Sequence, residues 1–233
     1  AASLRGRPEG IGLHADGIVP RAGSADRPPP IGLALGEATA TSRFWWFFAA
    51  IFFGSVGLFL ALVHINPYAR QQGLSVTQAN LLIGLIGVGN ILGRLLLGRI
   101  GDRIGALRFL VLLTVSLAVL CGLWSMAHGF LVLAVFAVLF GAANGGCIAL
   151  YPAVAAAWFG TKNLGAILGA LYIAVGIAAV AGGSFAGLLF DLRESYTLST
   201  MLAGACALLS AAAVLLAGRS GSVHRPAGDV QPP

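Results

Sequence analysis

Six long apolar runs, separated by short polar or charged stretches, dominate the chain after residue 42. Each run reaches the roughly 20 residues that a helix needs to cross a bilayer core about 30 Å thick. The pattern therefore predicts six transmembrane helices, and because their connections are short, neighbouring helices should run antiparallel. The predicted spans are Phe44–Ile65, Asn80–Leu97, Leu107–Ala127, Phe130–Val154, Leu164–Phe190 and Leu198–Ala217.

The composition agrees with a membrane protein. Of the 233 residues, 58% are hydrophobic and only 9% are charged, whereas soluble domains carry about 25% charge. The expected fold class is all-α integral membrane, a bundle of six transmembrane helices. Cys121, Cys147 and Cys206 all lie within apolar runs, which indicates neither a disulfide framework nor a metal site.

No catalytic motif stands out in the sequence. It contains no HExxH helix and no nucleotide-binding glycine loop. Asp102 is the only acid between Glu37 and Asp191, so the spans hold no pair of carboxylates for general acid–base work. We therefore expect a protein that is not an enzyme and that needs no cofactor.

Residues 1–42 contain five of the ten prolines and seven glycines with little periodicity, which predicts a flexible cytoplasmic tail or linker. The transmembrane region is then 43–218, followed by a cytoplasmic tail at 219–233. Eleven Lys and Arg residues fall on one side of the predicted spans and two, Arg70 and Arg193, on the other. By the positive-inside rule both termini are cytoplasmic, and the expected location is the cell membrane.

Arg94 is a charge inside the second predicted span, with Asn90 one helical turn earlier on the same face. Two interpretations are open. The guanidinium can snorkel to the nearby interface, or it can face inward, where its planar donor fork would bind a carboxylate. Asn144, Tyr151 and Tyr172 are further polar groups within the spans; each can line a cavity or bond a neighbouring helix.

Small residues recur on the helices, at four-residue spacing from Ala166 to Ala186 and as clusters of glycines. Such faces allow close helix packing, and they also allow the rocking that alternating access requires. Pro152 should end or kink the fourth span. The clustered glycines are Gly84, Gly87, Gly141, Gly145 and Gly146.

Residues 98–105 read GRIGDRIG, and Arg108 follows. This run resembles the cytoplasmic loop signature of the major facilitator superfamily, although Ala106-Leu107 replaces the usual basic pair. The resemblance implies a gating motif, a tight glycine loop in which Asp102 caps the next helix or accepts from arginines. Its expected members are Gly98, Gly101, Asp102, Arg103, Gly105 and Arg108.

The run from Asn90 to Gly98 resembles the eighth helix of the oxalate/formate antiporter and monocarboxylate transporter group. The resemblance covers residues 43–218 and implies that the six spans are helices seven to twelve of a twelve-helix transporter. The chain would then be a C-terminal half, residues 1–42 part of the central loop, and an N-terminal six-helix half the partner. Other matching segments are HINPYARQQGLS (His64–Ser75), YPAVAAAWFGTKNLGAILG (Tyr151–Gly169) and FDLRESY (Phe190–Tyr196).

Two departures from that group narrow the expected cargo. Monocarboxylate transporters carry an aspartate where this chain has Asn90, and oxalate transporters carry a lysine where it has Val175. The resemblance therefore implies secondary transport of a small organic anion: a monovalent one, with a monocarboxylate favoured, or one whose second charge is met by the absent half. Arg94 would hold the anion, with Asn90, Asn144, Tyr151 and Tyr172 around it. Two alternatives remain open: a half-transporter or membrane assembly module without transport of its own, and an exporter of another small molecule.

Overall fold

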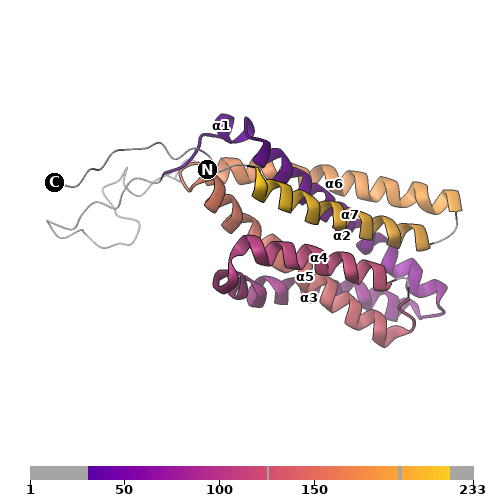
Figure 1. Ribbon diagram of the computed structural model, residues 1–233. Helices are drawn as coiled ribbons and strands as arrows, with labels where there is room; N and C mark the ends of the chain where they lie inside the picture. Colours follow the sequence, from indigo (N-terminus) through magenta and orange to yellow (C-terminus); the bar gives the residue numbers. More distant parts are fainter. Residues whose placement is uncertain (1–30, 125, 194–195, 221–233) are drawn as a thin grey trace, which may run out of the picture. The chain divides into compact units, whose positions relative to one another are not determined.

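The computed structural model describes residues 31–124, 126–193 and 196–220; the side chains of Asp102 and of residues 183–200 lie outside this description. Six of its helices are long and apolar enough to cross a membrane (Figure 1). The predicted all-α class and the six spans are confirmed. The helices are α1 (Leu35–Thr39), α2 (Ser42–Gln71), α3 (Val76–Ile104), α4 (Ala106–Trp124), α5 (Phe130–Phe159), α6 (Leu164–Arg193) and α7 (Tyr196–Arg219).

Local sequence signals begin two of the long helices. Before α2, the Thr41 hydroxyl accepts a hydrogen bond from the backbone N–H of Phe44 at 3.3 Å. Before α3, Ser75 Oγ accepts from Gln78 N at 3.2 Å and Gln78 Oε1 accepts from Ser75 N at 3.0 Å. This reciprocal capping box satisfies N–H groups that have no partner within the helix, and so it defines where α3 starts.

The structure corrects the expectation of a loop from residue 98. Helix α3 continues through Gly98, Gly101 and Arg103 to Ile104, and Gly105 alone separates it from α4. Arg99 and Arg103 are good helix formers, and together with Ile100 and Ile104 they outweigh the two helical glycines. Gly105 has φ +96°, a backbone conformation that residues with a Cβ rarely adopt.

Pro152 does not end the fourth span, because α5 continues for about two further turns to Phe159. A proline within a transmembrane helix removes one backbone hydrogen bond without necessarily stopping the helix. The carbonyl of Ile148, four residues earlier, is the group that loses its usual donor.

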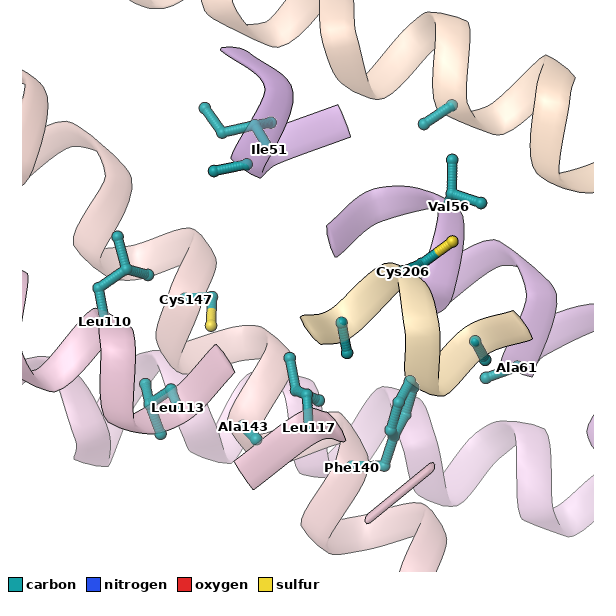
Figure 2. Packing of buried hydrophobic residues seen from close by; sticks show 14 of the residues in the cluster. Ile51, Val56, Ala61, Leu110, Leu113, Leu117, Phe140, Ala143, Cys147 and Cys206 are labelled. Atoms are coloured by element: carbon teal, nitrogen blue, oxygen red, sulfur yellow. The ribbon is translucent and has the colours of Figure 1, made fainter. Parts of the chain in front are cut away.

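The six spans pack as two interleaved sets of three. Helix α2 packs mainly against α7 and α6, and α5 packs mainly against α3 and α4, while α4 and α7 join the two sets (Figure 1). In chain order the spans form two triplets, α2–α4 and α5–α7. The first helix of each triplet packs against the second and third helices of the other one. Figure 2 shows apolar side chains from α2, α4, α5 and α7 meeting in the interior, among them Val56, Leu117, Phe140 and Cys206.

Helices α3 and α5 meet along glycines that permit direct backbone contact. A Cβ added at Gly89 or Gly93 would collide with carbonyls of α5, and one added at Gly141 or Gly145 would collide with carbonyls of α3. Both pairs have the four-residue spacing of a close helix crossing. By contrast, Gly84 and Gly87, on the same helix α3, have no neighbouring atom within 4 Å of the added Cβ.

Residues 31–33 are held against the segment that follows α5. Leu33 N donates to Phe159 O at 2.8 Å, and Thr161 N donates to Ile31 O at 3.1 Å. An isolated β-bridge pairs Gly32 with Gly160. The predicted tails at 1–30 and 221–233 lie outside the described residues.

Candidate functional site

A cavity of about 370 Å³ lies between α2, α3, α5 and α6. Four of the five residues that the sequence singled out for substrate binding line it, although they come from three different helices. Among the described residues that line this cavity, Arg94 is the charged one. The lining residues are Gly54, Ser55, Leu58, Arg94, Asn144, Ile148, Tyr151, Tyr172, Val175 and Gly176.

Asn90 lies beside the cavity and contacts Arg94. The Arg94 Nε donates to Asn90 Oδ1 at 3.0 Å, across one turn of α3. Because Nε makes this bond, the two terminal nitrogens of the guanidinium are not part of it. The Asn90 backbone is itself packed against Gly145 of α5. The α3–α5 crossing therefore sets the position of the helical turn that carries both side chains.

Asn144 and Tyr151 reach the cavity from α5, and both are buried. The Tyr151 ring packs edge-on against Phe47 of α2, with ring centroids 5.8 Å apart. Tyr172 enters from α6. Ile148, whose carbonyl loses its usual donor through Pro152, also lines the cavity. The site thus combines one cation, two phenols and an amide in largely apolar surroundings.

Gly54 and Ser55 of α2 line the cavity but were not among the predicted site residues. A Cβ at Gly54 would stand 3.2 Å from Ser210 Oγ and 3.5 Å from the Tyr151 hydroxyl oxygen, so the glycine leaves room for these oxygens. The sequence signal that could have identified them is this small and polar pair, Gly54-Ser55, in the middle of an otherwise apolar run. Val175 also lines the cavity. It occupies the position at which the resemblance to oxalate transporters would imply a lysine.

The predicted gating residues lie apart from the cavity lining, at the end of α3 and the start of α4. Arg103 and Arg108 are exposed. Gly101 faces the side chain of Leu150, whereas Gly98 has open space beside it. The side chain of Asp102 lies outside the described residues, so the structure does not test its expected contacts with arginines or with the next helix.

No three His, Cys, Asp or Glu side chains gather as metal ligands would within the described part of the chain. What the structure presents is a set of helices long and apolar enough to span a membrane, around a cavity whose wall carries the guanidinium of Arg94. This arrangement is that of a membrane transporter domain.

Comparison with known proteins identifies the family. Residues 45–232 match the Major Facilitator Superfamily, and the chain belongs to it. It is 30% identical to an MFS-type transporter of Gibberella moniliformis over 60% of this chain and 34% of that protein. It is 32% identical to monocarboxylate transporter 12 of Rattus norvegicus over 69% of this chain and 34% of that protein.

A third relative has a different cargo in its name. The chain is 29% identical to an aspyridones efflux protein of Emericella nidulans, over 61% of this chain and 29% of that protein. The chain thus matches about a third of the length of these curated relatives. It is a multi-pass membrane protein of a transporter family.

Proposed function

We propose that the protein carrying this chain is a secondary transporter for a small monocarboxylate, and that Arg94 binds the carboxylate. The observation that carries the proposal is the position of Arg94 on the wall of the 370 Å³ cavity, away from the helix ends. An arginine at the centre of a bilayer costs about 3 kcal/mol on insertion scales, so a functional partner is the expected reason for one.

The remaining groups have complementary roles in this proposal. Asn90 orients the guanidinium through its 3.0 Å bond to Nε, which leaves the terminal nitrogens for a bidentate contact. Asn144, Tyr151 and Tyr172 offer further hydrogen bonds to the anion. Val175 adds no second charge, so one carboxylate suits the site better than two.

The full site requires a second six-helix half. In carriers built from structural repeats, the substrate lies between the repeats, and the chain covers only about a third of its relatives. In this proposal both termini face the cytoplasm, the segment 98–108 belongs to the inner gate, and the protein lies in the cell membrane. The names of the monocarboxylate transporter relatives support the substrate class.

Uptake of labelled lactate, formate and oxalate by proteoliposomes containing the full-length protein tests the assignment. Arg94→Ala should abolish monocarboxylate uptake, and Arg94→Lys should recover it only in part, because an ammonium lacks the planar fork. Arg70→Ala is the matched control, since it removes the same charge from an exposed position at the end of α2. Uptake by Arg94→Ala at the wild-type rate would refute the role of this residue.

Export of a larger organic compound is the second candidate, and two observations favour it. The cavity volume falls within the range of about 300–1,000 Å³ that is typical of drug-sized ligands, and one relative is named as an efflux protein. Export that is insensitive to Arg94→Ala, together with absent monocarboxylate uptake, would favour this function.

Equal uptake by this chain with and without an N-terminal half would contradict the requirement for that half.

A further inference from the structure

A second hollow is lined by residues of α3, α4 and α5 and shares no lining residue with the transport cavity. It is a groove of about 490 Å³ between α3 and α4, with α5 as its floor. Residues that line it include Leu97 of α3, Leu113, Val115 and Val119 of α4, and Leu139 and Ala143 of α5. Figure 2 shows two of them, Leu113 and Ala143, in neighbouring positions.

The groove is suited to an apolar occupant. Its α4 and α5 walls remain open in this chain, with Val115 exposed to 41%, Val119 to 57% and Leu139 to 51%. The hydroxyl of Ser116 also lines the groove, but it donates back to the Leu112 carbonyl at 2.8 Å. The hydroxyl of Ser116 is therefore hydrogen-bonded within its own helix, as a polar group that faces lipid must be.

Arg108 stands in line with this groove, in the first turn of α4. It is exposed, and Val115 and Val119 follow it at seven and eleven residues, which places all three on one face of the helix. At about 1.5 Å per residue, Val119 lies ~16 Å along the axis from Arg108. That distance matches one leaflet of a hydrocarbon core about 30 Å thick. Arg103, also exposed, lies across the Gly105 link.

We propose that an anionic glycerophospholipid binds here, with an acyl chain in the α3–α4–α5 groove and its phosphate against Arg108. Two observations select this occupant. The groove and the arginine fit the length of one leaflet, and the positive charge is at the end where a headgroup would lie. Arg103 adds a second positive charge beside the headgroup. Each such cation contributes about a fivefold gain in affinity for an anionic lipid over a zwitterionic one.

Lipid retention by the purified full-length protein tests the proposal. The probes are phosphatidylglycerol and phosphatidylcholine with identical acyl chains, quantified on the protein by native mass spectrometry during titration in detergent. The variants are Arg108→Gln for the headgroup contact, and Val119→Trp and Leu139→Trp as two independent ways of filling the groove. The controls are Arg70→Gln, which removes a charge at the far end of α2, and Leu123→Trp, an exposed α4 position outside the groove.

The wild-type protein should bind phosphatidylglycerol at least fivefold more tightly than phosphatidylcholine. Arg108→Gln should lower that preference about fivefold, and at least one monodisperse groove variant should weaken both lipids tenfold, while both controls behave as wild type. Equal binding of the two lipids by the wild type overturns the proposal. So does an equal loss of preference in Arg70→Gln, or undiminished lipid binding by every monodisperse groove variant.

Discussion

The contact between α3 and α5 leads to a prediction in which one substitution has opposite effects at two positions. Gly145→Ala places a methyl group onto the backbone carbonyl of Asn90, whereas Gly84→Ala places it where no atom lies within 4 Å. The obstacle at Gly145 is main chain in mid-helix, which cannot rotate away as a side chain could. The clash is relieved only if the two helices separate.

The magnitude follows from the difference between these two variants. Replacing a helical glycine by alanine gains about 1 kcal/mol of helix propensity at either position, so this contribution cancels in the comparison. What remains is the cost of overpacking at Gly145, about 1–3 kcal/mol. We expect Gly84→Ala to raise the free energy of unfolding by about 1 kcal/mol. The free energy of unfolding of Gly145→Ala should be about 1–3 kcal/mol lower than that of Gly84→Ala.

Reversible denaturant unfolding in mixed micelles measures both variants under the same conditions. Gly93→Ala, which would collide with the Ala142 carbonyl, is a second variant on the opposite helix and should resemble Gly145→Ala. If Gly145→Ala and Gly93→Ala prove as stable as Gly84→Ala, the backbone contact between α3 and α5 is not tight and this reasoning is wrong.

Three further substitutions test other contacts. Arg43 is buried and its Nε donates to the Ala217 carbonyl at 3.1 Å; Arg43→Met should lower the unfolding free energy by about 1.5–3 kcal/mol, and full stability would contradict that role. Val175→Lys adds a second cation to the cavity wall and should shift uptake toward oxalate over lactate about tenfold, since a charged hydrogen bond contributes about 1.5 kcal/mol; an unchanged ratio in competition uptake would argue against the monovalent site. Ser75→Ala removes the cap of α3 and should cost about 1 kcal/mol in the same unfolding titration, with Ser75→Asp close to wild type; equal losses would rule out capping.

The spans could be predicted because a long apolar run with few charges has no stable place except lipid or a large core. Their ends could not, since helix geometry continues past the apolar stretch wherever the next residues also favour it. The charged residues after Leu97 illustrate this: they change composition abruptly, yet α3 continues to Ile104.

The site was partly accessible from sequence for a related reason. A polar side chain within a span needs a partner, so Arg94, Asn144, Tyr151 and Tyr172 stood out before any contact was known, and the structure brings them to one cavity. Their mutual distances depend on how α3, α5 and α6 pack, and the spacing of residues along one helix does not contain that information.

Glycines show the same limit more clearly. In sequence, Gly84 and Gly93 are equivalent small residues on one helix, but only Gly93 meets the backbone of α5. Which face of α3 turns toward α5 is a property of the assembled bundle. The pattern predicted that small faces exist and could not assign them to a neighbour.

The link at Gly105 limits how this part of the molecule can move. One residue joins α3 to α4, and the two Cα–Cα steps from Ile104 to Ala106 reach only about 7 Å when fully extended, which leaves no slack for a shift by the 5.4 Å of a helical turn. The two helices can hinge at this point, but neither can slide past the other by a turn. Any displacement of Arg94 along the membrane normal would therefore carry α4 with it, together with whatever lipid lies against that helix.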